Sequence, residues 1–180
     1  MTSSLKLVTL CTGNVARSVM LGYMFTTLAE NNGLDWQVRS AGTHVIEGSA
    51  MSSRTRDALL AIDELGEHRY GHHRSHQLSA EDVSWADAVL TTEASQVNFV
   101  RTNFPEATNK TVSLRQFLRE APLDQPLGEQ LAYVSSLEPL DYFDVADPAG
   151  GDQVTYNACA AQLWSLAQAF VTLMGDDSER

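Results

Sequence analysis

Two periodicities of hydrophobic residues alternate along the chain and predict its secondary structure. Short apolar runs rich in β-branched residues are typical of buried strands, and apolar residues at three- and four-residue steps are typical of helices. The run Leu5–Leu10 predicts a strand, and the helical pattern over Ser18–Asn31 ends at the C-cap signal Asn31-Asn32-Gly33. Trp36–Arg39 alternates as a second strand, so one crossover helix joins two strands that we expect to be parallel.

The rest of the chain continues this alternation. Strands are predicted over Ala88–Thr91 and Thr111–Leu114, and helices over Arg54–Leu65, from the cap at Ser79, over Glu93–Asn103, over Gly128–Leu137 and over Tyr156–Met174. Strands that alternate with helices are typical of α/β proteins. We therefore expect a single domain over residues 1–180, a three-layer α/β/α sandwich around a four-stranded parallel sheet in the order 2-1-3-4.

Two segments are less regular than the rest. Residues 120–143 are rich in proline, leucine and acidic residues. They fit either an insertion or lid in front of the candidate site described below, or a plain surface excursion. The polar end of the chain, residues 175–180, is expected to fray.

The C-terminal helical stretch is apolar enough to resemble a membrane span, but its residues segregate into two faces. The polar face consists of Gln162, Ser165, Gln168 and Thr172, and the apolar face of Cys159, Leu163, Leu166, Phe170 and Leu173. The pattern predicts an amphipathic helix that packs on the sheet, with Cys159 as a core residue.

Charge and cysteine content restrict the partners and the location of the protein. With 12 basic and 23 acidic residues, its formal net charge is −11. This charge argues against binding to nucleic acids or anionic membranes, which need a basic face. Cys11 and Cys159 give neither a disulfide framework nor a cysteine-based zinc motif, and the short apolar run Leu7–Leu10 is too short for a signal peptide. We expect a cytoplasmic monomer that needs no cofactor.

The loop between the first strand and the first helix carries the candidate chemistry. It reads Cys11-Thr12-Gly13-Asn14-Val15-Ala16-Arg17-Ser18 and turns at Gly13-Asn14, the residue types that best tolerate a positive φ. Backbone N–H groups of such a loop and of the helix start favour an anion, and the planar guanidinium of Arg17 can hold two phosphate oxygens. The same positive field would stabilise a thiolate at Cys11. The loop therefore predicts a nucleophile at the base of a phosphate site formed by residues 12–18.

Phosphoryl transfer would use these groups together. In-line attack by Cys11 gives a cysteinyl-phosphate intermediate, while Arg17 and the loop amides bind the equatorial oxygens. The hydroxyl of Ser18 can hydrogen-bond the Cys11 sulfur and make it a better leaving group in the second step. Ser18 also fits a plain helix cap, and one hydroxyl could serve both purposes.

At these residues the chain resembles a known family. The stretch Val8–Ser18 resembles the signature loop of the low-molecular-weight protein tyrosine phosphatases, which include bacterial arginine-phosphate phosphatases and, on the same fold, arsenate reductases. Arg39–Thr43, His73–Ser79 and Asp144–Gly151 fit the family in the same order, and residues 120–143 match it least. The resemblance implies a hydrolase of phosphorylated proteins or small phosphomonoesters, with phosphate as product and inhibitor.

The resemblance also implies a general acid. Asp147 matches the family's aspartate that protonates the leaving group and then activates water. From the residues alone, Asp141, Asp144 and Asp152 compete with Asp147 for this role.

Three further residues match positions that support the loop in the family. Asn14 and Ser40 match residues whose hydrogen bonds hold the loop in its shape, and His73 matches a histidine that bonds to the loop asparagine. His73 lies in a group of histidines with His68, His72 and His76, but no cysteine or obvious carboxylate completes a ligand set. No metal site is expected.

Two features depart from the family: the residue Ala16, and the stretches His44–Glu47 and Ala149-Gly150, which stand where eukaryotic-type members line the pocket with aromatic residues. A phenol ring gains less from stacking in such a pocket. Many members carry a second cysteine at the position of Ala16, so the reversible disulfide that protects an oxidised nucleophile is not expected here. The spelling Asp147-Pro148-Ala149-Gly150-Gly151 looks closer to the arginine-phosphatase branch, but that branch carries a hydroxyl residue at the position of Val15. We therefore predict a protein-tyrosine phosphatase, with a protein-arginine phosphatase or a small-thiol-dependent arsenate reductase as alternatives.

Overall fold

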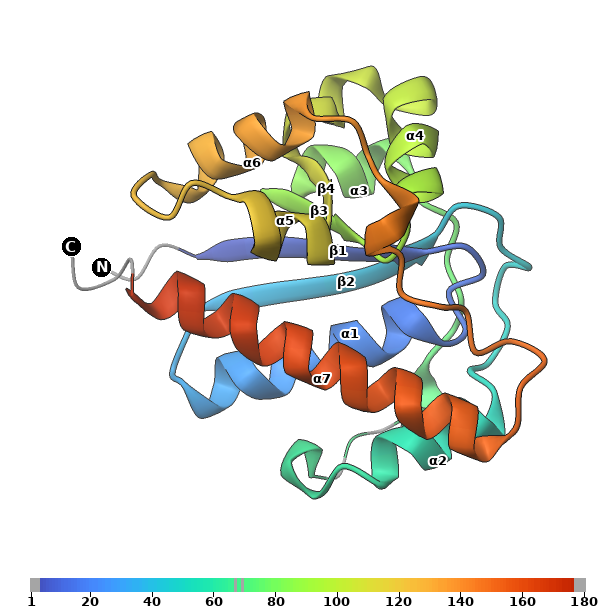
Figure 1. Ribbon diagram of the computed structural model, residues 1–180. Helices are drawn as coiled ribbons and strands as arrows, with labels where there is room; N and C mark the ends of the chain where they lie inside the picture. The colour runs from blue at the N-terminus through green and yellow to red at the C-terminus, as the bar shows by residue number, and fades with distance from the viewer. Residues whose placement is uncertain (1–3, 67, 69, 177–180) are drawn as a thin grey trace.

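The computed structural model describes residues 4–66, 68 and 70–176. Within these residues one sheet contains β1 Leu5–Cys11, β2 Trp36–Gly42, β3 Ala88–Thr91 and β4 Thr111–Ser113, all parallel and in the order β2-β1-β3-β4 (Figure 1). This confirms the predicted α/β class and strand order. β1 is central because it pairs with β2 along its whole length and with β3 on its other side.

The helices of the described residues follow the strands in alternation. They are α1 Arg17–Asn31, α2 Ser53–Leu60, α3 Ala80–Trp85, α4 Ala94–Asn103, α5 Leu114–Glu120, α6 Leu127–Ser136 and α7 Gln153–Asp176, with 3₁₀ helices at Asp63–Leu65, Tyr70–His72, Pro105–Lys110 and Asp141–Phe143. Ser52 and Ser79 cap α2 and α3 with their side chains, as their residue types predict.

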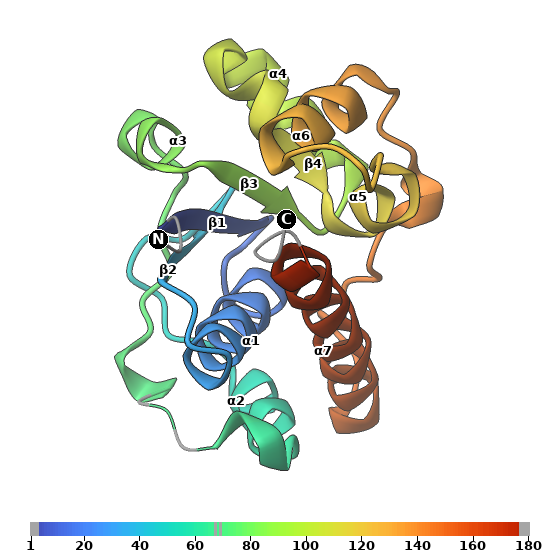
Figure 2. The same ribbon diagram turned by 90° about the vertical axis from the view of Figure 1, so that its left-hand side faces the viewer.

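Alternate residues of β1 face opposite layers of the sandwich. Leu7 packs into a core with α1 and α7, whereas Val8 and Leu10 pack into a second core with α3 and α4. The two views show α1, α2 and α7 on one side of the sheet and α3 and α4 on the other, with α5 and α6 beside β4 (Figures 1 and 2). The period-two pattern of a strand buried on both faces produces this layering.

Two predicted elements end earlier in the structure than the sequence pattern indicates. The helix expected over Arg54–Leu65 ends at Leu60, because Ile62 adopts an extended conformation, and the 3₁₀ helix that follows buries Leu65 instead. The fourth strand ends at Ser113, and Leu114 begins α5, a helix that the sequence pattern did not reveal. A helix of seven residues spans only two turns, too few for an apolar repeat to distinguish it from a strand end.

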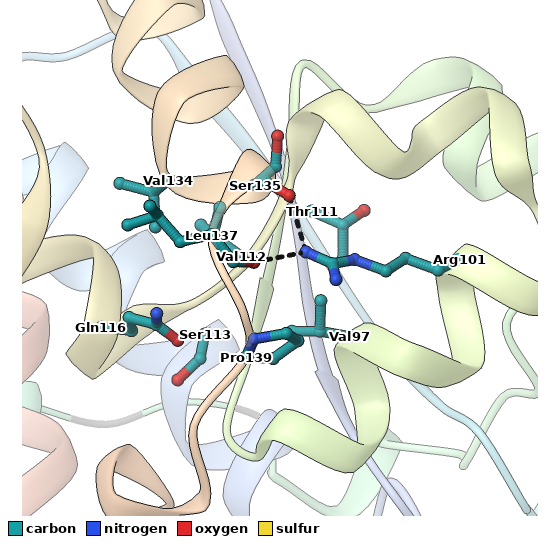
Figure 3. A pocket seen from close by; sticks show the side chains of 10 residues that line it. All are labelled: Val97, Arg101, Thr111, Val112, Ser113, Gln116, Val134, Ser135, Leu137 and Pro139. Carbon is teal, nitrogen blue, oxygen red and sulfur yellow. Dashed lines mark hydrogen bonds between the residues drawn. The ribbon is translucent and has the colours of Figure 1, made fainter.

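The segment 120–143 contains α6, which packs beside β4. Leu131 and Val134 of α6 are buried, and Arg101 of α4 donates to the carbonyls of Ser135 and Leu137 at 2.6 and 3.0 Å. A small pocket lies between α4, β4 and α6 (Figure 3). Gln116 of α5 also lines this pocket, whereas no residue of the Cys11–Ser18 loop does.

The C-terminal helix has the predicted two faces. Cys159, Leu163 and Phe170 are buried, and the four residues of the predicted polar face are exposed, whereas Leu166 and Leu173 are only partly buried. By length and composition α7 could cross a membrane, but the core helix of a soluble protein meets the same test, and α7 packs against α1. It continues through Gly175 and Asp176 of the tail that we expected to fray, and residues 177–180 lie outside the described residues.

Candidate active site

The candidate loop leaves the carboxyl end of β1 and enters α1. Asn14 has a φ of 52°, the left-handed conformation that the Gly13-Asn14 turn predicts. The loop lies close against the end of β2, where a Cβ atom on Gly42 would be 2.5 Å from the carbonyl oxygen of Thr12. Only glycine at position 42 therefore allows this approach.

Two hydrogen-bond donors lie at the sulfur of Cys11. Its Sγ atom is 2.9 Å from the Oγ atom of Ser18 and accepts from the backbone N–H of Asn14 at 3.3 Å. Cys11 is 3 % exposed, so the sulfur lies at the base of the loop. Both donors can stabilise negative charge on the sulfur.

Asn14 connects the loop to three other segments. Its Nδ2 donates to Ser18 Oγ at 2.9 Å and to Ser40 Oγ at 3.0 Å, and its Oδ1 accepts from the backbone N–H of His76 at 2.9 Å. The Nε2 of His73 lies 2.8 Å from the Asn14 carbonyl oxygen. Burial lowers the pKa of His73 although this hydrogen bond acts in the opposite direction, which favours a neutral ring that donates from Nε2. The structure thus brings Ser40 and His73 to Asn14, and it adds His76, which the sequence analysis considered only as a metal ligand.

Several loop amides face no acceptor within the protein. The N–H groups of Gly13, Val15 and Ala16 make no hydrogen bond to any residue that the structure describes. The Val15 carbonyl, in contrast, accepts from the hydroxyl of Thr55 at 3.0 Å, which ties the loop to α2. Free amides in a loop that precedes a helix can bind the oxygens of an anion.

Arg17 is almost fully buried and lies between two carboxylates. Its Nη1 contacts a carboxylate oxygen of Glu93 and donates to the Val145 carbonyl at 2.9 Å, and its Nη2 lies 3.1 Å from Oδ2 of Asp147. Burial alone would lower the pKa of Arg17, but the hydrogen bond to Glu93 and the charges of Asp147 and Glu93 raise it. The guanidinium is therefore held as a fixed cation beside the loop.

The sequence analysis missed Glu93. This residue follows β3, directly before α4, at the sheet edge where the loop after β1 also lies. Ligands of parallel sheets bind at this edge, and that rule is the signal that could have drawn attention to Glu93.

The competing aspartates have other partners in the structure. Asp144 accepts from the backbone N–H of Ala94 at 2.7 Å, and its pKa is raised by burial. Asp152 accepts from both the N–H and the hydroxyl of Thr155 at 2.9 Å, so it caps the start of α7. Of the four candidates, Asp147 is the one whose carboxylate pairs with Arg17.

Cys159 is buried, as predicted, and it also lies close to the site. Its sulfur is 4.0 Å from the carbonyl oxygen of Ala146, the residue before Asp147. The sequence pattern of α7 does not show this contact. Burial raises the pKa of Cys159 to about 11, so its thiol stays protonated.

Among the described residues, no group of three or more His, Cys, Asp or Glu side chains is arranged to hold a metal ion.

Comparison with known proteins agrees with this fold and site. Residues 6–131 match the family described as low molecular weight phosphotyrosine protein phosphatase. The chain therefore belongs to this family, and it is a phosphatase.

Individual relatives come from two branches of the family. The chain is 34 % identical over 157 residues to a protein-arginine-phosphatase of Geobacillus stearothermophilus. The aligned region covers 87 % of this chain and 86 % of the relative. It is 26 % identical over 167 residues to a protein-arginine-phosphatase of Bacillus subtilis, covering 93 % of this chain and 95 % of that protein. The crystal structure of a low molecular weight protein tyrosine phosphatase from T. tengcongensis superposes with a TM-score of 0.75 at 27 % identity, over 93 % of this chain and 98 % of the other.

Proposed function

We propose that this protein is a protein-tyrosine phosphatase that acts through a cysteinyl-phosphate intermediate, with Asp147 as general acid. The observation that carries the proposal is the arrangement of four side chains around one loop. The Cys11 sulfur lies 2.9 Å from Ser18 Oγ, and the buried Arg17 at the end of the loop lies 3.1 Å from Asp147.

In the first step, the Cys11 thiolate attacks phosphorus and the bond to the leaving oxygen breaks. Arg17 and the free amides of Gly13, Val15 and Ala16 bind the equatorial oxygens, whose charge changes most in the transition state. Asp147 gives its proton to the leaving oxygen. Its side chain is 49 % exposed, so it can reach a group that enters from solvent.

In the second step, the Asp147 carboxylate takes a proton from the water that attacks phosphorus. The phosphorus–sulfur bond breaks, and the Ser18 hydroxyl stabilises the departing Cys11 thiolate. Phosphate is released, and because it fits the same loop it also inhibits. In both steps the substrate phosphate competes with the Asp147 carboxylate for the Arg17 guanidinium, since both are anions that bind beside Nη2.

Val15 favours phosphotyrosine over phosphoarginine. Its side chain is half-buried in the loop and offers no hydrogen bond to a guanidinium, whereas an apolar wall suits a phenol ring. A protein-arginine phosphatase is the second candidate, because the relative of 34 % identity carries that name. We also infer a cytoplasmic location, since a thiolate enzyme needs a reducing compartment.

A kinetic panel tests both candidates. Peptides that carry phosphotyrosine, phosphoarginine or phosphoserine at the same position are tested as substrates of the wild type, Cys11→Ser and Val15→Thr. Reduction of arsenate in the presence of added thiols is measured with the same proteins. For the wild type we expect kcat/KM for the phosphotyrosine peptide to exceed the values for the other two peptides at least about tenfold. Val15→Thr should reduce the ratio of kcat/KM between phosphotyrosine and phosphoarginine. Cys11→Ser should lower kcat/KM for phosphotyrosine by more than about a thousandfold. Preference of the wild type for phosphoarginine would select the second candidate, and reduction of arsenate without phosphatase activity would contradict both.

A further inference from the structure

We propose that Gln96 is a positioning residue that connects the first residue of the phosphate-binding loop to the carboxylate partner of Arg17. The inference rests on the proposed function and assigns the buried support of that site. Gln96 lies in the first turn of α4 and is 1 % exposed. Its side-chain amide has one end toward the Glu93 turn and the other toward the loop.

The oxygen of this amide fixes the turn that carries Glu93. Oε1 of Gln96 accepts from the backbone N–H of Glu93 at 3.0 Å, and from the N–H and hydroxyl of Thr92 at 2.9 and 3.1 Å. Glu93 in turn contacts the Arg17 guanidinium. The position of the Glu93 carboxylate therefore depends on the Gln96 oxygen.

The nitrogen of the same amide reaches the loop. Nε2 of Gln96 donates to the Thr12 hydroxyl at 3.3 Å, and the Thr12 carbonyl accepts from the backbone N–H of His44 at 2.9 Å. Thr12 is thus held by the segment that follows β2 on one side and by α4 on the other. These two contacts fix Thr12, the residue that follows the Cys11 nucleophile.

The oxygen and the nitrogen of the Gln96 amide have different roles: the oxygen caps the helix, and the nitrogen supports the phosphate-binding loop. A side chain that accepts from the N–H at the start of its own helix is an ordinary capping contact, and the Gln96 oxygen fits that description. The contact to Thr12 has no part in capping, because it leads from α4 to a loop on another strand. A side-chain amide carries its donor and its acceptor on two separate atoms, whereas an ionised carboxylate only accepts and a hydroxyl has a single oxygen for both.

The experiment compares Gln96→Met with the control Gln116→Met. Gln116 is 3 % exposed and equally bonded: its Nε2 donates to the Glu120 carboxylate and the Glu138 carbonyl, and its Oε1 accepts from Leu140. It lines the pocket beside α6, whose lining includes no residue of the Cys11–Ser18 loop (Figure 3). Binding of inorganic phosphate is measured by calorimetry, together with the free energy of unfolding and with KM and kcat for p-nitrophenyl phosphate.

We expect Gln96→Met to weaken phosphate binding and raise KM by about tenfold, because both ends of the loop lose their support. Gln116→Met should lose comparable stability and leave phosphate binding within about twofold. Equal effects of the two variants on phosphate binding would reduce Gln96 to a helix cap and overturn the inference.

Thr12→Val provides a second variant that keeps the cap intact. It removes only the acceptor of the Gln96 nitrogen, so phosphate binding should weaken by about threefold or more. In the double variant Gln96→Met/Thr12→Val, the loss of phosphate-binding free energy should be smaller than the sum of the losses in the two single variants. The reason is that both changes remove the same contact between Gln96 and Thr12. Full additivity, or no change in Thr12→Val, would contradict the connection. Since phosphate binding needs no turnover, these results are independent of whether phosphotyrosine is the substrate.

Discussion

Arg17 and Asp147 form an ion pair between a nearly buried guanidinium and a half-exposed carboxylate, with Nη2 and Oδ2 3.1 Å apart. The arginine comes from the start of α1, and the aspartate precedes α7. In the proposed mechanism, substrate phosphate competes with the carboxylate for the same guanidinium. Asp147 would then lie beside the reacting group from the start and would be released toward the leaving oxygen when phosphate binds.

The role of Asp147 can be tested through the leaving group. Asp147→Asn should lower kcat by about a hundredfold for phenyl phosphate, whose leaving oxygen needs a proton, and by less than about tenfold for p-nitrophenyl phosphate. Steady-state kinetics with both esters measure the difference. An equal loss for the two esters would move the acid role to another carboxylate.

Glu93→Gln tests the second partner of Arg17. Removing the charge leaves a buried guanidinium with less compensation, so we expect stability to fall by about 1–3 kcal/mol and kcat/KM to fall by about tenfold. Urea unfolding and steady-state kinetics measure the two effects. Glu106→Gln, an equal charge change at an exposed residue, serves as control. Unchanged kinetics in Glu93→Gln would show that Asp147 and the Val145 carbonyl orient Arg17 without it.

His76 predicts a dependence of stability on pH. Its Nε2 lies 2.7 Å from Asp82 and its Nδ1 3.2 Å from Glu47. Burial lowers the pKa of His76, but the two carboxylates outweigh it and raise the pKa above the ordinary 6.5. Because the pKa is higher in the folded state, the stabilisation that the protonated His76 gives to the fold is complete below pH 6.5. This stabilisation is lost as pH rises through the folded-state pKa of His76.

The measurement is the difference in unfolding free energy between wild type and His76→Gln at several pH values. A difference is needed because His73, whose pKa is lowered, changes stability with the opposite sign. We expect the advantage of the wild type to shrink above pH 6.5, and a difference that stays constant with pH would contradict the ion pairs.

Tyr70→Phe should not destabilise the protein. The side chain is 4 % exposed, and its hydroxyl has no hydrogen-bond partner among the residues that the structure describes. Burial, and the nearby Tyr23, raise the pKa of Tyr70 to about 12. Since a buried hydroxyl without a partner costs about 1–3 kcal/mol, we expect the variant to be neutral or more stable by about 1 kcal/mol in urea unfolding. A loss of stability above about 1 kcal/mol would indicate a partner for the hydroxyl.

Oxidation should inactivate the enzyme irreversibly. Peroxide converts a reactive thiolate to sulfenic acid, and rescue needs a second thiol. Cys159 lies near Asp147, but its protonated, buried thiol is a poor nucleophile. We expect treatment with dithiol to restore little activity to the wild type and more to Ala16→Cys, with mass spectrometry showing sulfinic acid at Cys11. A disulfide between Cys11 and Cys159 in the oxidised monomer would contradict this prediction.

Local sequence determined the strands, most of the helices and the loop Cys11–Ser18. The reason is that periodic burial, caps and a glycine-asparagine turn act over a few neighbouring residues and remain visible in the sequence. The contact between Cys11 and Ser18 belongs to this group, because the loop and the first helical turn fix both ends. The selection of Asp147, in contrast, depended on family resemblance.

Only the tertiary structure brought Glu93, Gln96 and His76 to the loop, placed Cys159 near Asp147 and made α5 a helix. These contacts join segments that meet at the carboxyl edge of a parallel sheet, and no period in any one segment encodes which side chains face each other there. The surroundings of Arg17 show the difference most clearly. Its place at the end of the loop is written in the sequence, whereas its two carboxylate partners are selected by the packing of β3, α4 and α7 around it.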